Sequence, residues 1–264
     1  MGVMIFDRSH SPLTPTPTGL KVIARARKML MEAEGLFAEI RGIHDSIEGH
    51  FRVGVIPTLA PYLLPVFLPS FLEKYPQTRL DVREMQTSMI IKALKEDKID
   101  IGLLVTPLDD DELREIPMFH EPFLFFGPKD HADGEIKPNE LPDHGLLLLE
   151  EGHCFRSQML EICSNSSSGV PGLHYLSGSI EALKGLVRQG MGYTLIPSLS
   201  AKPEDSSYVR PFAAPVPIRE VSIVVHESFV RERVMEIMKE EVLRNLPAGY
   251  AKEERHFKVR WRQL

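Results

Sequence analysis

The feature that most constrains the fold is a repeated alternation of strand-like and helical segments, which begins after Gly49. Strand-like runs occur at residues 51–56, 79–84, 99–105, 122–126, 145–149, 173–176, 193–196 and 221–226. Helical periods lie between several of these runs, at residues 60–74, 87–97, 154–164, 179–189 and 230–245. This alternation predicts an α/β architecture in which the strands pair largely in parallel.

Two irregular segments interrupt the alternation, near residues 126–128 and near residues 212–219. They indicate that the chain leaves a first lobe, builds a second lobe and then returns to the first. The predicted fold is therefore α/β, with two Rossmann-like lobes joined by two crossover segments and a cleft between the lobes. Ligands bind at the carboxyl ends of strands in open sheets of this kind.

The segment before Gly49 has a different pattern. Residues 11–19 are rich in proline and predict a non-helical connector, with Thr18 or a neighbour as a helix N-cap. Residues 20–48 then carry apolar side chains three and four positions apart, which is a heptad seam. The seam consists of Ile23, Ala26, Leu30, Ala33, Phe37, Ile40 and Ile47, with His44 in the remaining position. An amphipathic helix packed on its own domain and an intermolecular coiled coil both fit this pattern.

Charge and composition exclude several classes of function. A net charge of −6 and a pI near 6.0 argue against nucleic-acid binding by most of the chain, so any DNA contact must use a small patch or lie outside it. No apolar run approaches the roughly 20 residues of a membrane-spanning helix. Two cysteines without a secretory signal are typical of a cytoplasmic protein. The acidic run at residues 109–112 predicts a solvated loop, and we expect neither a metal site nor a cofactor.

The two cysteines, Cys154 and Cys163, lie nine positions apart. His153 and Arg156 flank the first thiol, and cationic neighbours lower the pKa of a thiol. If this segment is helical, the two side chains lie on opposite faces and roughly 13 Å apart along the axis. A disulfide needs Cα atoms within about 7 Å, so the pair would join only if the helix unwinds, which is the outline of a redox switch. Two buried, unreactive cysteines fit the same spacing.

Two threonines stand at the carboxyl ends of predicted strands, Thr58 after the first and Thr87 after the second. Each also precedes a predicted helix, so either one taken singly fits an N-cap. Both together, beside a predicted cleft, favour a small polar pocket.

Several of these segments together resemble the LysR-type transcriptional regulators, and in particular their peroxide sensors. The resemblance covers nearly the whole chain. It rests on Ile56-Pro57-Thr58, Pro61-Tyr62-Leu63-Leu64-Pro65, Glu84-Met85-Gln86-Thr87 and above all Glu151-Gly152-His153-Cys154-Phe155-Arg156 with Cys163. Residues 2–8, with 13–14 and 18–19, look like the end of the family's winged helix-turn-helix domain, and the helices that read DNA would be missing.

The resemblance implies four parts of the chain. Residues 1–19 would be a remnant of the winged helix-turn-helix domain, and residues 20–48 a dimerisation helix that links it to the regulatory domain. Regulatory lobe I would comprise residues 49–126 and 220–264. Lobe II would comprise residues 127–219 and carry the redox cysteines. The two lobes would have the fold of type 2 periplasmic binding proteins.

The resemblance also implies residue roles. Cys154 would be the peroxidatic cysteine and Cys163 the resolving cysteine, which form a reversible disulfide after oxidation. The residues that would bind peroxide or steady the thiolate are Thr58, Thr87, His153 and Arg156. The family often carries an arginine late in the second lobe. His226 is expected at that position here, and because imidazole can be neutral at pH 7 it is left out of the predicted site.

The expected function is therefore that of a redox-sensing regulator and not of an enzyme. Its partners would be hydrogen peroxide, further copies of the chain in a dimer or tetramer, and thiol reductants such as glutaredoxin or thioredoxin. Promoter DNA and RNA polymerase would be partners only of a full-length protein. A thiol peroxidase, and a LysR-type sensor of a small organic effector with incidental cysteines, are the alternative functions.

Overall fold

The computed structural model describes residues 3–7, 9, 14–40, 47–129, 134–163, 175, 178–247, 250 and 256–259. They fall into two compact units, one made of residues 1–47 and 228–236 and the other of residues 48–227 and 237–264.

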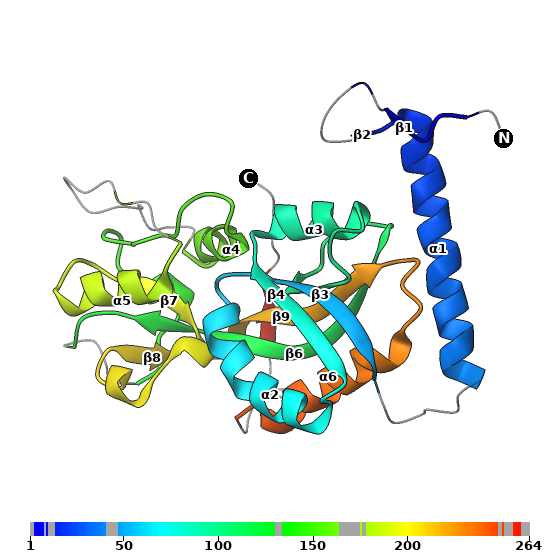
Figure 1. The fold of residues 1–264 in the computed structure, drawn as a ribbon. Coiled ribbons are helices and arrows are strands. Elements are labelled where there is room, and N and C mark those ends of the chain that lie inside the picture. The colour runs from blue at the N-terminus through cyan, green and yellow to red at the C-terminus, as the bar shows by residue number, and fades with distance from the viewer. Residues whose placement is uncertain are drawn as a thin grey trace. The chain divides into compact units, whose positions relative to one another are not determined.

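The N-terminal part is a small hairpin followed by a long helix (Figure 1). Strands β1 (Phe6–Asp7) and β2 (Thr14–Pro15) pair antiparallel, and α1 spans Pro17–Ile40. Thr16 caps the helix, because its Oγ1 accepts a hydrogen bond of 2.9 Å from the Gly19 N–H. The helix thus begins before the expected residue 20. Residues 41–46 lie outside the described residues, and residues 47–48 are not helical, so the expected end at residue 48 is wrong.

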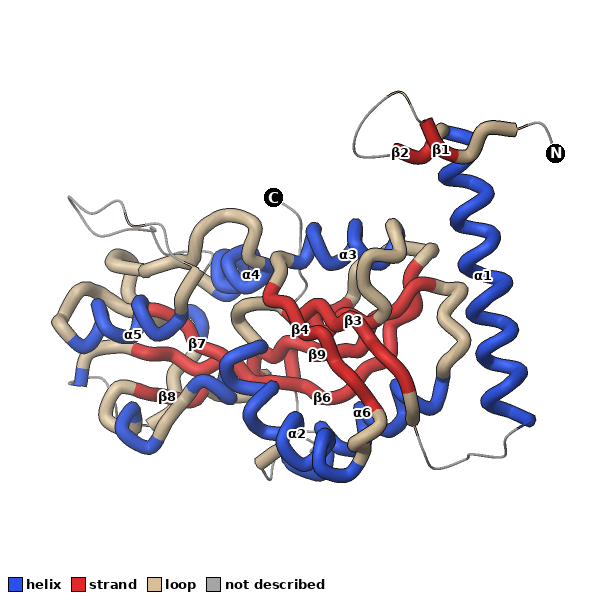
Figure 2. Tube along the Cα trace, in the orientation of Figure 1, coloured by secondary structure: helices blue, strands red, loops and turns tan. Residues whose placement is uncertain are grey.

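A mixed sheet of eight strands runs through the second unit (Figure 2). Its strands are β3 (Gly49–Val55), β4 (Thr78–Glu84), β5 (Ile101–Thr106), β6 (Leu113–Phe126), β7 (Thr194–Pro197), β8 (Val209–Pro211), β9 (Val216–His226) and β10 (His256–Lys258). The order is β4-β3-β5-β9-β6-β7, with β8 on β6 and β10 on β9. Only the β3–β4, β3–β5 and β9–β10 pairs are parallel, so the expected predominance of parallel pairing is wrong.

The helices of this unit lie close to their predicted places. They are α2 (Ala60–Lys74), α3 (Thr87–Lys95), α4 (Cys154–Ile162), α5 (Ile180–Arg188) and the part of α6 (Glu232–Asn245) from residue 237 on, with short 3-10 turns η2 (Pro138–Glu140), η3 (Ser198–Ser200) and η4 (Pro203–Asp205). Two predicted strands differ. Residues 145–149 form no strand, and only an isolated bridge joins Leu146 to Tyr193. Residues 173–176 lie outside the described residues except for Tyr175, which is in no strand.

The two crossovers between the lobes are long, regular strands. The 14-residue β6 and the 11-residue β9 pair antiparallel, with one register shift between Pro117 and Phe119. The first part of β6 lies in the sheet of lobe I, and its last four residues pair with β7 in lobe II. Charged and proline residues hid the first part of each strand from the apolar pattern, which predicted only residues 122–126 and 221–226. The predicted two-lobed α/β fold is nevertheless confirmed.

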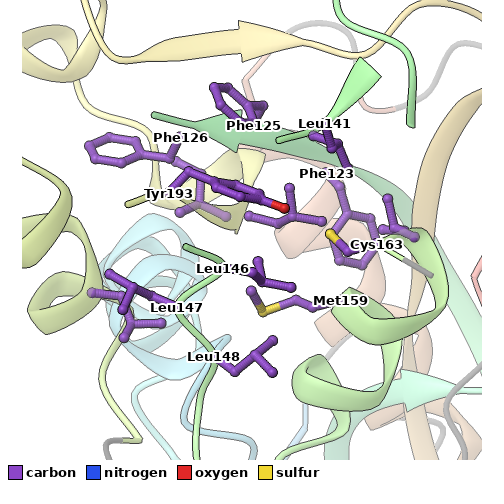
Figure 3. Close-up of a cluster of buried hydrophobic side chains, with 14 of the residues drawn as sticks. Phe123, Phe125, Phe126, Leu141, Leu146, Leu147, Leu148, Met159, Cys163 and Tyr193 are labelled. Carbon is purple, nitrogen blue, oxygen red and sulfur yellow. The ribbon is translucent and has the colours of Figure 1, made fainter. Parts of the chain in front are cut away.

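Lobe II has its own apolar core, in which one cysteine is a member (Figure 3). Phe123, Phe125 and Phe126 of β6 supply its aromatic centre, and Met159 and Cys163 enter it from the α4 segment. Stacking of Phe123 on Phe155, with ring centroids 5.2 Å apart, extends this core to the start of α4. The core therefore holds both ends of the helix that carries the cysteines.

No described helix combines the length and hydrophobicity that crossing a membrane requires.

Candidate functional site

The loop before Cys154 packs directly against the start of α3. Gly152 has a φ of +90°, a left-handed conformation that favours glycine. A Cβ on Gly152 would also lie only 2.7 Å from Oε1 of Gln86, so the end of the Gln86 side chain would have to move. Glycine at this position therefore allows the left-handed turn by which the loop enters α4 beside the start of α3.

Cys154 is a free thiol at the first position of α4 and is 2% exposed. Burial raises its pKa, because the low-dielectric interior disfavours a thiolate. The charge of Arg219, the Thr87 hydroxyl and the backbone N–H groups of Phe155 and Cys154 act in the opposite direction. The expectation that neighbours would lower this pKa is therefore wrong in its net direction, because complete burial outweighs them.

The cation near Cys154 is Arg219, which comes from β9. Its Nη1 donates to Thr58 Oγ1 and its Nη2 to the Thr58 carbonyl, each at 3.1 Å. Its Nε donates to Glu121 Oε2 at 2.8 Å. The guanidinium also lies over the ring of Phe155, 5.4 Å from its centroid. The expected replacement of the family's arginine by His226 is thus wrong: Arg219, seven residues earlier on the same strand, supplies the cation at the site.

Neither predicted threonine is an N-cap. The N-caps of α2 and α3 are Leu59 and Gln86. Thr58 is buried and accepts the hydrogen bond from Arg219, and Thr87 is equally buried. The Thr87 hydroxyl has no nitrogen or oxygen partner among the described residues, and the group that it faces is the Cys154 thiol. A thiol is a weak hydrogen-bond partner, so this buried hydroxyl favours a small polar ligand.

This cluster near Cys154 keeps hydrogen-bond donors that are not used within the described part of the chain. A guanidinium has two N–H groups on each Nη, and only one of the two on Arg219 Nη1 forms a hydrogen bond within the described part of the chain. Thr58 accepts from Arg219, so its own proton is free to donate to a ligand. Together with Thr87, these groups can hold a small molecule with oxygen atoms next to the sulfur.

The structure does not bring the other two predicted site residues to the sulfur. His153 has its Nε2 3.6 Å from Glu150 Oε1, and burial lowers its pKa, which favours a neutral ring at pH 7. Arg156 donates from Nη1 to the carbonyl of Leu149 at 2.7 Å. These contacts fix the loop before α4. A peroxide-binding role for either residue stays a prediction.

Cys163 is the C-cap of α4 and is also a free, buried thiol. Burial in the apolar core raises its pKa to about 12, although the Tyr193 hydroxyl lowers it in part. Cys154 and Cys163 are thus nine helical steps apart, which is roughly 13 Å along the axis and on opposite faces. The predicted separation of the two side chains by a folded helix is confirmed for α4.

Comparison with known proteins places the two-lobed part in a defined class. A family model described as the LysR substrate binding domain matches residues 44–247. These residues contain Thr58, Thr87, both cysteines and Arg219.

Individual relatives show to which group within this family the chain belongs. The chain is 32% identical to a probable hydrogen peroxide-inducible genes activator of Streptomyces viridosporus, over 94% of this chain and 82% of that protein. It is 31% identical to the DNA-binding transcriptional dual regulator OxyR of Escherichia coli, over 85% and 75%. A full-length OxyR variant from Pseudomonas aeruginosa has a TM-score of 0.78 at 32% identity, covering 96% of this chain and 84% of that one. The chain therefore belongs to the LysR family of transcriptional regulators, in its OxyR group of hydrogen peroxide-responsive regulators.

Arg219 and Glu121 are the site residues that sequence reasoning missed. Both carry a charge within a strand whose other residues are mostly apolar, Arg219 directly after Ile218 and Glu121 directly before Pro122 and Phe123. Charged residues are almost never fully buried unless they are paired. A fully buried basic residue on β9 and a fully buried acidic residue on β6 were therefore the signal, and recognising it required seeing that β6 and β9 are strands along their whole length.

Proposed function

We propose that this protein is a peroxide-sensing regulatory domain in which hydrogen peroxide oxidises Cys154 and a reversible Cys154–Cys163 disulfide follows. The observation that carries the proposal is the buried Thr87 hydroxyl, which has no nitrogen or oxygen partner among the described residues and faces a thiol that is also close to the charge of Arg219. A further relative supports the choice of ligand. An OxyR cysteine-to-serine variant from Corynebacterium glutamicum, described as hydrogen peroxide-bound, has a TM-score of 0.67 at 27% identity, covering 96% of this chain and 84% of that one.

The first chemical step is attack of the Cys154 thiolate on one oxygen of the peroxide. The S–O bond forms as the O–O bond breaks, the sulfur is oxidised to sulfenic acid, and the departing hydroxide takes up a proton to leave as water. Thr58, Thr87 and the remaining N–H on Arg219 Nη1 would stabilise the negative charge on the departing oxygen. Because burial raises the pKa of the Cys154 thiol, only a small fraction of it is thiolate. Peroxide reacts with this fraction, and the surrounding donors stabilise the negative charge on the departing oxygen.

The second step is condensation of the sulfenic acid with Cys163, which forms the S–S bond and releases a second water. The folded α4 holds the two sulfurs apart, so the helix must unwind first. Unwinding draws Cys163 out of the apolar core that it shares with Phe123 and Met159. The lobe II core then repacks, and we propose that this repacking changes the geometry between copies of the chain.

The apolar residues of α1 support assembly of more than one copy. Leu20, Met29 and Leu30 are exposed on this helix, at 58%, 73% and 65%. A long helix with exposed apolar residues is suited to pairing with a second such helix. In a full-length protein, a dimer or tetramer of this kind would carry the change to promoter DNA and RNA polymerase. Cytoplasmic thiol reductants such as glutaredoxin or thioredoxin would reset the disulfide by thiol exchange.

Mass spectrometry after a few equivalents of hydrogen peroxide tests the proposal. We expect a peptide that contains Cys154 linked to Cys163, and its loss after treatment with a dithiol reductant. Absence of this linkage from oxidised, folded protein would overturn the proposal.

The Cys163→Ser variant is the matched control, since it should stop at sulfenic acid or higher oxidation states on Cys154. Steady-state measurements separate the regulator from a thiol peroxidase. A regulator consumes one peroxide for each switching event, whereas a peroxidase turns over rapidly with its reductant.

A further inference from the structure

Glu121 is a buried carboxylate to which the proposed function assigns no role. It lies on β6, is 0% exposed, and has both oxygens engaged. Oε2 accepts a hydrogen bond from Arg219 Nε at 2.8 Å and lies 2.7 Å from Nη2. Oε1 accepts a hydrogen bond of 2.9 Å from the backbone N–H of Leu199 in η3. Glu121 therefore ties the guanidinium of Arg219 to a fixed point in lobe II.

This attachment determines where the guanidinium points. A carboxylate that contacts Nε and Nη2 together fixes the plane of the planar guanidinium. Because the plane is fixed on that edge, Nη1 on the opposite edge is held against Thr58 Oγ1 at 3.1 Å. The same orientation keeps the guanidinium over the ring of Phe155, the residue that follows Cys154.

We propose that Glu121 is a positioning residue for the reaction of Cys154 with peroxide, and that its buried negative charge offsets part of the Arg219 charge at the thiol. The proposal rests on the peroxide reaction proposed above. Glu121 thus has two separable effects. It aims Nη1 at the departing peroxide oxygen, and it limits the thiolate fraction in the absence of peroxide. A sensor gains from this combination, because unspecific electrophiles react with the thiolate, whereas peroxide also uses the aimed donors.

The two tyrosines near this pair, and His153 beside the thiol, keep one protonation state at the pH values of the test. Tyr62 and Tyr250 both interact electrostatically with Glu121 and Arg219, and burial raises the pKa of both, that of Tyr250 to about 12. Glu181 accepts a hydrogen bond from Tyr62 and lies near Lys184 and Lys202. His153 adjoins Cys154, but its pKa is lowered. Between pH 7 and 9 the tyrosines and His153 are therefore neutral.

Two variants of Glu121 in the Cys163→Ser background separate charge from position. Glu121→Gln removes the charge, and Glu121→Asp keeps it but shortens the side chain. We would measure two rates from pH 7 to 9: iodoacetamide alkylation, which needs the thiolate but not the donors of Arg219, Thr58 and Thr87, and sulfenic acid formation by hydrogen peroxide. Glu121→Gln should be alkylated about tenfold faster at pH 7, because removal of a nearby negative charge favours an anion. Glu121→Asp should be alkylated at the parent rate.

The ratio of the peroxide rate to the alkylation rate should fall by about tenfold or more in both variants, since misplacement of a donor slows a reaction that depends on its geometry. Glu220→Gln is the matched control. Glu220 is a buried carboxylate that follows Arg219 directly in the sequence, and its partners are Thr106, His120 and Lys258. Its replacement should leave both rates unchanged.

An unchanged ratio in Glu121→Asp, or no faster alkylation of Glu121→Gln, overturns the assignment. If Glu121→Gln fails to fold, the ratio in Glu121→Asp alone decides. Failure of the parent protein to react with peroxide at Cys154 would instead count against the proposed function. The alkylation rates of the Glu121 variants would still test the charge of Glu121 in that case.

Discussion

The two ends of α4 hold the same functional group in opposite surroundings. At the first end, Cys154 is buried next to hydroxyl groups, backbone N–H groups and the guanidinium of Arg219. At the other end, Cys163 lies in the apolar core of lobe II with Phe123, Met159 and Tyr193 (Figure 3). Burial raises the pKa of both thiols, but among the described residues only Cys154 has a nearby cation that opposes this shift.

This difference shows that burial by itself does not determine the chemistry of a cysteine. Both thiols are almost completely buried, at 2% and 3% exposure, so accessibility cannot distinguish them. What distinguishes them is the set of groups that can stabilise negative charge at the sulfur or on a departing oxygen. One end of the helix is built for attack on a small polar molecule, and the other keeps its thiol unreactive until the helix unwinds.

The largest effect is expected when each cysteine is replaced in turn and the peroxide oxidation rates of the two remaining thiols are compared. In Cys163→Ser, peroxide should still oxidise Cys154. In Cys154→Ser, the remaining Cys163 should react at least about 100-fold more slowly at pH 7, because the cation and hydroxyl groups that stabilise the departing oxygen lie beside Cys154 and not in the apolar core around Cys163. Mass spectrometry of samples quenched over time measures both rates. Comparable rates for the two single-cysteine proteins would show that the two surroundings do not differ in the way proposed.

Removal of the Thr87 hydroxyl tests the polar end of α4 by itself. Thr87→Val keeps the shape of the side chain and should slow the peroxide reaction of Cys154 by roughly 10- to 100-fold. The free energy of unfolding should stay the same or rise by about 1 kcal/mol, because the buried hydroxyl that is lost has no nitrogen or oxygen partner among the described residues. Stopped-flow kinetics and urea unfolding measure the two quantities.

Thr194→Val is the matched control for that substitution. Thr194 is also buried, but its Oγ1 donates to the Leu147 carbonyl at 2.9 Å. It should lose about 1–3 kcal/mol of stability, since the carbonyl loses a donor, and leave the peroxide rate unchanged. A Thr87→Val protein that behaves like Thr194→Val would remove the support for a ligand beside Thr87.

The Cys163 thiol at the apolar end of α4 should make the stability of the folded protein depend on pH. The pKa of Cys163 is about 12 in the folded protein and has the usual value of 9.0 in the unfolded chain. Above pH 9 the unfolded state releases this proton first, so stability falls as the pH rises from 9 toward 12. Between pH 9 and 10.5 the protein should lose on the order of 2 kcal/mol more than the Cys163→Ala variant. Parallel pH profiles of the two proteins in urea unfolding would contradict this.

Sequence patterns predicted one part of this molecule well and another poorly, and the reason is physical. The helices with a clear 3.6-residue period, such as α2 and α4, lie within a few residues of their predicted bounds. The strands β6 and β9 were truncated because Pro117, Pro122, Arg219 and Glu220 interrupt their apolar runs. β6 and β9 also pair antiparallel, which brings together residues that are far apart in the sequence. A local hydrophobic period carries no information about such pairs.

The residues of the candidate site also divide into those that local sequence features predicted and those that they did not. Cys154, Thr58 and Thr87 were identified from local features, namely strand ends and a short motif. Arg219 comes from a strand 65 positions after Cys154 in the sequence, and only the sheet brings it to the site. The expected activation by His153 and Arg156 relied on neighbours in the sequence. On a helix and its N-terminal loop, adjacent side chains point in different directions, so such neighbours need not meet the sulfur.

The smallest expected effect concerns the middle of α4. Gln158 is fully buried, and its Nε2 donates to the Val259 carbonyl at 2.9 Å, while its Oε1 has no hydrogen-bond partner among the described residues. Val259 follows β10 directly and is buried in the lobe II core. The hydrogen bond therefore joins the C-terminal strand to the helix that must unwind.

Because unwinding of α4 breaks the bond to Val259, Gln158→Leu should speed disulfide formation without changing the oxidation of Cys154. Loss of one neutral hydrogen bond of about 1 kcal/mol from the folded helix corresponds to roughly fivefold in rate. Rapid-quench mass spectrometry can follow the sulfenic acid and the disulfide separately, and the first rate serves as the internal control. An increase in the second rate alone would place the barrier in the helix and its apolar end. Equal acceleration of both rates would mean that Gln158 also acts on the polar end, so the two ends of α4 could not be treated as separate.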